Sequence, residues 1–216
     1  MALGGSDPEA PFKGTGFRGA YAPESPDKPD PVCSIVAIEE SSGEVIWKKE
    51  DIHNYIGCTL ALRGKHAVFQ TSSGLTCMEG NTGEVLWQVE KDITSEDGTS
   101  PNTVILSDEM VYAQEGKSFY AYALEDGTQK WKAPIAQNYE KAADLFLAAG
   151  AVWTGGKKQP TAYDPKTGEK LLRIPQRMRG PMSHDRCYRN FITERYYINS
   201  KTGGADFVSL DGKKEI

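Results

Sequence analysis

Several features that mark zinc-binding, nucleic-acid-binding and membrane-spanning proteins are missing from this chain of 216 residues. Its four cysteines show no Cys-x-x-Cys spacing, which argues against a structural zinc site. Lys and Arg number 25 against 30 Asp and Glu, so the net charge is −5. Because phosphate binding needs a basic surface, this balance argues against a nucleic-acid partner. No apolar run approaches the ~20 residues of a membrane-spanning helix, so we expect no transmembrane segment.

Short motifs for phosphate binding and nucleophilic catalysis are missing as well. The chain has no Gly-x4-Gly-Lys-Ser/Thr loop, no Gly-x-Ser-x-Gly elbow and no pair of adjacent cysteines. Residues 1–8 lack the basic region and the apolar region of a secretory signal, so we predict no signal peptide in this chain. Cys77 alternates with apolar neighbours, which is typical of a buried free thiol.

A block of eleven residues that recurs four times is the strongest positive signal. Each copy holds a Gly, and in three copies a Trp follows four residues later. The glycines recur every 40 to 44 residues, at Gly43, Gly83, Gly127 and Gly168. A period near 40 with strands on both sides of a Gly turn is typical of β-propeller blades. We therefore predict an all-β fold, a β-propeller of four-stranded antiparallel blades.

The two marked residues of the block have separate physical roles. Gly suits a turn that demands a positive φ. The Trp lies on the outer strand, where its ring can pack across the seam between neighbouring blades, because one blade cannot bury its face alone.

Strand and turn signals divide the chain into an arm and a series of blades. Residues 1–31 are rich in Pro and Gly without periodicity, which predicts an extended arm. Residues 32–216 form the blades: a half blade at 32–50, complete blades at 57–90, 101–133 and 143–174, and an incomplete blade at 187–212. This gives about four to five blades and favours an incomplete ring, a piece of a longer propeller. An open arc exposes edge strands, which predicts homo-oligomers through those edges.

The block resembles the tryptophan-docking repeat of quinoprotein dehydrogenases, which use pyrroloquinoline quinone (PQQ), and of their non-catalytic relatives. Ala162, Asp164, Thr167 and Gly168 match that pattern, as do Thr82, Gly83 and Trp87. The relatives include the propeller lipoprotein that assists outer-membrane protein assembly. The resemblance covers about residues 33–212 and implies the propeller fold.

Two further stretches, 144–155 and 180–196, resemble large bacterial proteins with PQQ-binding-like propellers. This resemblance implies a periplasmic or extracellular location and a longer parent chain. Quinoprotein dehydrogenases hold PQQ and Ca²⁺ in the central funnel, with an Asp base and often a ring of adjacent cysteines. This chain has no such cysteine pair, and no calcium-ligating set can be matched to it. We therefore expect no cofactor, with PQQ and Ca²⁺ as the alternative.

The segment 177–195 is the main candidate site, because five of the eight arginines lie there beside a histidine and an aspartate. Clustered guanidinium groups favour carboxylates or phosphates. His184 could act as a general base oriented by a carboxylate such as Asp185 or Asp206. We favour a purely structural alternative, in which these arginines form ion pairs with acidic residues of neighbouring blades. The candidate anion-binding residues are Arg177, Arg179, Arg186, Arg189 and Arg195.

His53 is a second, weaker catalytic candidate, in the predicted inter-blade connection 51–55. Equivalent connections, at Asp92 and at 138–140, also carry polar side chains. A ring of His and carboxylates at one end of a propeller could hold a metal for hydrolysis, although no spacing requires it.

These observations together favour a non-enzymatic binding or scaffold module that recognises a protein or a small anionic ligand. The first alternative is a quinoprotein-type dehydrogenase with PQQ and Ca²⁺. The second is a metal-dependent hydrolase or lactonase at the propeller mouth.

Overall fold

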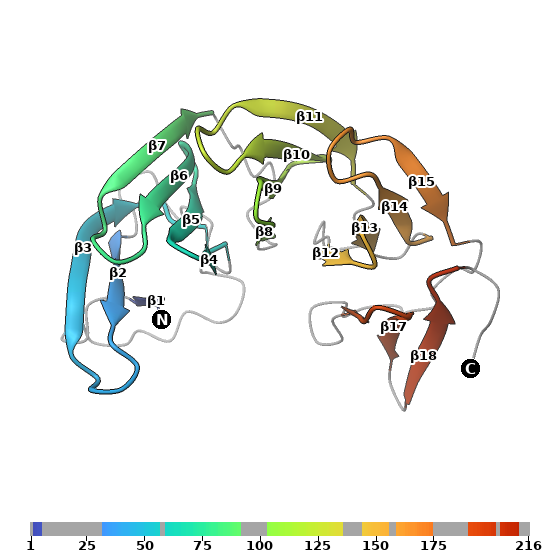
Figure 1. The fold of residues 1–216 in the computed structure, drawn as a ribbon, viewed down its shortest axis with the longest axis horizontal. Coiled ribbons are helices and arrows are strands. Elements are labelled where there is room, and N and C mark those ends of the chain that lie inside the picture. Colours follow the sequence, from blue (N-terminus) through green and yellow to red (C-terminus); the bar gives the residue numbers. More distant parts are fainter. Residues whose placement is uncertain are drawn as a thin grey trace, which may run out of the picture.

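The computed structural model describes residues 2–5, 32–56, 59–91, 103–135, 144–155, 159–174, 190–201 and 204–211. These ranges contain eighteen strands and no helix. The strands form five antiparallel sheets that follow one another along an open arc (Figure 1). The predicted all-β fold with four-stranded antiparallel blades is thus confirmed. Within the described ranges, no helix has the length and hydropathy needed to cross a membrane.

In each sheet the strands lie side by side in chain order. The first sheet holds β1 (Ala2–Gly5), β2 (Val32–Ile38) and β3 (Val45–His53). The second holds β4 (Ala61–Arg63), β5 (His66–Thr71), β6 (Gly74–Glu79) and β7 (Val85–Glu90). The third holds β8 (Val104–Leu106), β9 (Met110–Glu115), β10 (Ser118–Ala123) and β11 (Gln129–Pro134). The fourth holds β12 (Asp144–Ala148), β13 (Ala151–Gly155), β14 (Thr161–Tyr163) and β15 (Lys170–Arg173). The fifth holds β16 (Phe191–Ile192), β17 (Tyr196–Lys201) and β18 (Gly204–Ser209).

The first sheet has a strand that the sequence analysis does not predict. Ala2–Gly5 forms β1 and pairs antiparallel with β2, from Ala2↔Ala37 to Gly5↔Ser34. This four-residue segment has no apolar alternation that could predict a strand. Its position is set by backbone pairing to the edge of β2. The same sheet has a long outer strand, since β3 continues to His53.

The two ends of the sheets differ in what they carry. One end, the turn end, holds the Gly turns and the hairpins that join the first and second strands. At the opposite end, the connection end, the fourth strand of a sheet finishes and the first strand of the next sheet begins. The outer strands β3, β7, β11 and β15 follow the rim of the arc (Figure 1).

Tryptophans of the outer strands lock each sheet to the Gly turn of the next. Trp47 Nε1 donates to Gly80 O at 2.9 Å, Trp87 Nε1 to Leu124 O at 2.9 Å, and Trp131 Nε1 to Pro165 O at 3.1 Å. Each indole also lies flat against the repeat glycine of that turn. A Cβ on Gly127 would come within 2.7 Å of the Trp87 ring, and those on Gly83 and Gly168 would come as close to Trp47 and Trp131. The predicted packing of Trp across the seam is therefore present.

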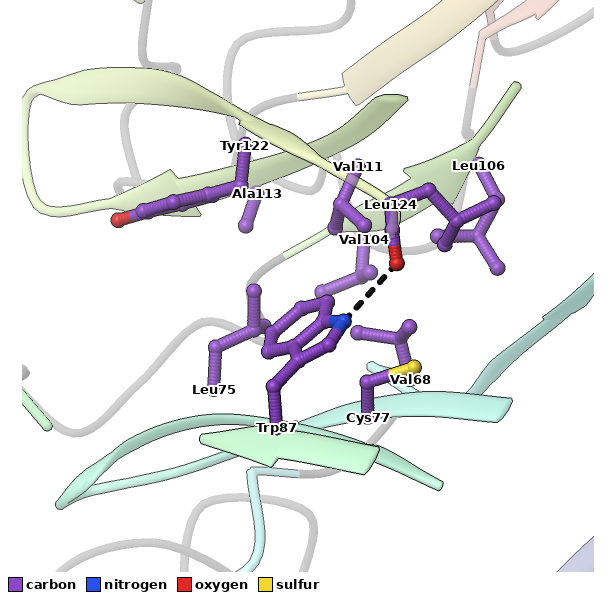
Figure 2. Packing of buried hydrophobic residues seen from close by; sticks show 10 residues of the cluster. All are labelled: Val68, Leu75, Cys77, Trp87, Val104, Leu106, Val111, Ala113, Tyr122 and Leu124. Carbon is purple, nitrogen blue, oxygen red and sulfur yellow. Dashed lines mark hydrogen bonds between the residues drawn. The ribbon is translucent and has the colours of Figure 1, made fainter. Parts of the chain in front are cut away.

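The core lies between the sheets, as Figure 2 shows for the second and third. Trp87 projects from β7 among side chains of both sheets, including Val68 and Leu75 on one side and Val111 and Tyr122 on the other. Cys77 belongs to this cluster, fully buried and free, and burial raises the pKa of its thiol to about 12. The fourth repeat has Leu172 at the Trp position, and this leucine packs, partly buried, against the cluster between the fourth and fifth sheets.

Gly43 and Gly127 allow the contribution of Trp docking to be measured. Both have nearly the same φ, 73° and 72°, but no described atom lies within 4 Å of a Cβ on Gly43. In dilute solution, Gly43→Ala should lower the free energy of unfolding by about 1 kcal/mol, the cost of a left-handed Ala. Gly127→Ala should cost about 1–3 kcal/mol more, because Cβ displaces the Trp87 ring. Urea unfolding followed by circular dichroism measures both, and equal losses would contradict the docking role.

Candidate functional site

The predicted site residues fall into two groups in the structure. Arg177, Arg179, His184, Asp185, Arg186 and Arg189 lie outside the described residues. Arg195 is exposed in the turn between β16 and β17, where its backbone N donates to Thr193 Oγ1 and its O accepts from Leu210 N. That turn belongs to the turn end, whereas β15 finishes and β16 begins at the opposite end. Arg195 therefore does not lie at the end of the fifth sheet where β16 begins.

His53 lies in strand β3 and not in a loop, as its last residue, paired with Val32. Its side chain is exposed at the connection end. The residues after it are held against the second sheet, because Asn54 O accepts from Ser72 N at 3.0 Å and Tyr55 bridges to Thr71. Within the described part of the chain, no three His, Cys, Asp or Glu side chains form a group that could hold a metal ion. This connection therefore has a clear structural role.

Buried polar groups gather at the connection end. Among the described residues, four atoms buried there have neither a hydrogen-bond nor an ion-pair partner and belong to residues without a further contact: Gln70 Oε1, Asn190 Oδ1, Tyr197 Oη and Asn199 Nδ2. Most buried polar atoms in proteins are paired, since each unpaired group costs about 1–3 kcal/mol. Three of these four atoms belong to the fifth sheet or to Asn190, the residue just before it. The seam between the fourth and fifth sheets is therefore the candidate site.

At that seam, Tyr197 reaches from β17 across to β13. A Cβ on Gly155 would coincide with the Tyr197 hydroxyl, so the absence of a side chain at Gly155 makes room for it. Asp144 is the strand partner of Gly155, and Asn190 Nδ2 donates to Asp144 Oδ2 at 3.1 Å. Asn199 lies two residues beyond Tyr197 on the same buried face of β17. We call Asp144, Gly155, Asn190, Tyr197 and Asn199 the seam cluster.

The seam cluster offers neutral hydrogen-bonding groups beside a single carboxylate. Burial, with a smaller effect from the charge of Asp144, holds the pKa of Tyr197 well above its usual value, so the phenol keeps its proton. Because the Asn190 amide N–H points to Asp144, its Oδ1 is left as an acceptor. Asn199 Nδ2 is a donor. An acceptor, a donor and a hydroxyl together match an amide or hydroxyl group better than an anion, which Asp144 would repel.

A second polar cluster, between the second and third sheets, is by contrast satisfied internally. Tyr122 Oη donates to Glu115 Oε1 at 2.7 Å, and Lys91 forms an ion pair with Glu115 Oε2. The Lys91 ammonium also lies 3.3 Å from the centre of the Tyr120 ring. Burial and the adjacent carboxylate raise the pKa of Tyr122. With its groups paired to one another, this cluster joins the two sheets and offers little to a ligand.

The residues of the seam cluster are missed by the sequence analysis, which selects histidines, acids and arginines. One usable signal exists, because Gly155 ends an otherwise apolar run, Ala151–Thr154, without being part of a Gly turn. A glycine in a strand often marks a close approach by another group. The amides of Asn190 and Asn199 carry no pattern that distinguishes them from surface asparagines.

The seam cluster does not fit a quinoprotein site. It contains one carboxylate, whereas Ca²⁺ is usually held by six to eight oxygen ligands that include several carboxylates. We therefore derive no chemical step through PQQ or Ca²⁺ from the described residues.

Comparisons with solved structures show the same fold. BamB from Moraxella catarrhalis has a TM-score of 0.62 at 16% identity, over 86% of this chain and 60% of that chain. A europium-containing methanol dehydrogenase has 0.57 at 12% identity, over 87% of this chain and 48% of that chain. The quinohemoprotein alcohol dehydrogenase ADHIIG from Pseudomonas putida HK5 has 0.56 at 12% identity, over 87% and 39%. This chain thus spans less than two thirds of the length of each of these three proteins.

A comparison with curated proteins finds no match. The family described as "Outer membrane protein assembly factor BamB" matches residues 33–200, which is most of the chain. The matched region includes all four copies of the Trp-docking block and the whole of the second, third and fourth sheets. The chain therefore belongs to this family of PQQ-like β-propeller repeat proteins.

Proposed function

We propose that the chain is a non-enzymatic binding module that recognises an amide-bearing partner, a protein segment, through the seam cluster. The observation that carries the proposal is the convergence of three buried, unpaired polar atoms at one seam, on Asn190, Tyr197 and Asn199. Each atom would recover about 1–3 kcal/mol on meeting a partner group, which is a source of affinity once the seam opens to admit that group.

The placement of these groups also supports recognition. Tyr197 and Asn199 lie on β17, and Gly155 lies on β13, so the sheets fix their positions. The hydrogen bond to Asp144 orients Asn190. A small anionic ligand, the other partner expected from the arginines, is less favoured at this seam because Asp144 adds a negative charge.

The family supports a binding role of the same general kind. Its description names an outer membrane protein assembly factor. A periplasmic or extracellular location belongs to the same proposal, because the description places that factor's task at the outer membrane. The structural similarity to the two dehydrogenases, at 12% identity, supports a shared fold but not a shared chemical activity.

Tyr197→Phe tests whether the buried hydroxyl is unpaired in the unliganded protein. Removing an unpaired hydroxyl should leave the free energy of unfolding unchanged or raise it. Tyr122→Phe is the matched control, because it removes a donor from buried Glu115 and should cost about 1–3 kcal/mol. Urea unfolding of both variants gives the comparison. A large loss in Tyr197→Phe would show that the hydroxyl is already satisfied within the protein.

The ligand class can be tested with simple probes and NMR. N-acetyl-Gly-Gly-amide should shift the amide signals of Gly155 and Asn199 in a ¹⁵N-labelled protein, whereas acetate should not. Asn199→Ala should abolish the shifts, and Tyr122→Phe should retain them. Preferential binding of acetate would replace the amide proposal with an anion site, and no binding by either probe would contradict it.

Alkaline pH should weaken the fold through its buried tyrosines. The pKa of Tyr197 is raised on folding, so its contribution to stability is complete below the ordinary tyrosine pKa of about 10 and is lost as pH rises toward the folded value. Unfolding free energies measured between pH 8 and pH 12 should therefore fall above about pH 10. Tyr197→Phe should show a shallower fall, and an unchanged slope would contradict the buried environment.

The two enzymatic alternatives predict activities that this proposal does not. Reconstitution with PQQ and Ca²⁺ should give no dye-linked alcohol oxidation, and ester or lactone hydrolysis should show no response to a chelator or to added metal. His53→Ala and His184→Ala should leave both baselines unchanged. Quinone-dependent turnover, or hydrolysis that a chelator removes and metal restores, would overturn the binding-module proposal.

A further inference from the structure

The two terminal sheets of the arc each present one side of an interface that the chain forms repeatedly, and no described sheet covers that side. Successive sheets stack face to face, so each central sheet has one face toward the preceding sheet and one toward the next. The first sheet has no described sheet before it, and the fifth has none after it. Figure 1 shows these two sheets at opposite ends of the open arc.

On the first sheet, the face that would lie against a preceding sheet can be identified from the pairing of its second and third strands, β2 and β3. In each repeat, one residue of the third strand pairs with the Trp position, and the residue after it faces the preceding sheet. Those following residues are buried to 0%, 1% and 7% exposure in the second, third and fourth sheets, as Met78, Tyr122 and Tyr163. The equivalent residue of the first sheet is Ile38, which follows Ala37, the partner of Trp47, and is only half-buried.

The turn beside Ile38 has the geometry of a docking turn. Gly43 N donates to Glu39 O at 2.8 Å, as Gly83 N donates to Glu79 O at 2.8 Å, and both glycines have a φ of 73°. Gly83 is covered by the Trp47 ring, whereas no described atom comes within 4 Å of a Cβ on Gly43. The first sheet is therefore shaped to receive a sheet on this side.

On the fifth sheet, the next-sheet face carries exposed aromatic side chains. Counted back from the turn, Phe207 is equivalent to Cys77, Ala121 and Ala162, because Leu210 N donates to Arg195 O as Leu124 N donates to Glu109 O. Those three residues are at most 2% exposed against the next sheet, but Phe207 is 39% exposed. Phe191 is 58% exposed on the same face, and Tyr196 packs edge-on against Phe207 at 6.3 Å. The opposite face packs on the fourth sheet through Tyr197 and Val208.

We propose that the aromatic face of the fifth sheet packs on the Ile38 face of the first sheet of a second copy of this chain. The two faces occupy the same positions as the two sides of the sheet-on-sheet contact present four times among the described sheets, with Phe207 supplying apolar area where the internal sheets have a small residue and an outer strand. The proposed contact is one between sheet faces, distinct from edge-strand pairing. Because the two surfaces are different, the association is head-to-tail and gives closed rings or extended assemblies.

The proposal can be tested by complementation between two variants. Ile38→Lys damages only the receiving face, and Phe207→Lys damages only the aromatic face. In sedimentation velocity over a range of concentrations, the unmodified chain should associate, and each variant alone should weaken association at least tenfold. An equimolar mixture should form 1:1 heterodimers, because one intact face of each kind remains.

Controls separate this contact from other causes. Leu86→Lys and Leu171→Lys change exposed residues of outer strands, away from the stacking faces, and should leave association unchanged. Circular dichroism checks that each variant folds, and Phe207→Gln replaces Phe207→Lys if it does not. A chain that stays monomeric at high concentration, association insensitive to both variants, or a mixture without heterodimers would each overturn the proposal. None of these outcomes depends on ligand binding at the seam cluster.

Discussion

The docking of an outer-strand tryptophan on the next sheet's Gly turn is the interaction on which this structure depends. A single sheet of three or four short strands buries too little apolar surface to be stable alone. The indole joins two such sheets by one hydrogen bond to a backbone carbonyl and by flat contact with a glycine. The glycine serves two purposes at once, since it adopts a left-handed turn and leaves room for the ring. Repetition of this contact from Trp47 to Trp131 sets the spacing of the first four sheets.

The same stacking explains why, among the described residues, the buried unpaired polar groups lie in the seams toward the connection end. The inner faces near the turn end are filled by indoles and aliphatic side chains, as in the Trp87 cluster. Toward the connection end, the seams hold polar residues in two arrangements. Between the second and third sheets, Glu115 is paired on both oxygens and acts as a structural link. Between the fourth and fifth sheets, Tyr197 and Asn199 keep unpaired groups, and this feature is what the proposed binding role rests on.

The fifth sheet differs from the others at the positions that stacking controls. Small residues, Cys77, Ala121 and Ala162, stand on the next-sheet face of the complete sheets, where the outer strand and its docking residue cover them. Phe207 stands at that position in the fifth sheet, where no outer strand is described. A large aromatic side chain at this position provides the apolar area for a further contact. The seam cluster and the stacking faces thus both arise from the same repeated interface between sheets.

The four copies of the Gly and Trp block by themselves determined the strand-turn-strand units, the antiparallel sheets and the role of the Trp, because turn geometry and period depend on local residues. The sequence could not show β1, since Ala2–Gly5 is a strand only by pairing with β2. Nor could it show the seam cluster, because Asp144, Gly155 and Tyr197 are distant in sequence and meet only where two sheets stack. The arginine-rich segment drew attention through charge, yet Arg195 stands at the turn end. Which polar groups end up buried without a partner is set by how neighbouring sheets pack, and that was decided only by the tertiary structure.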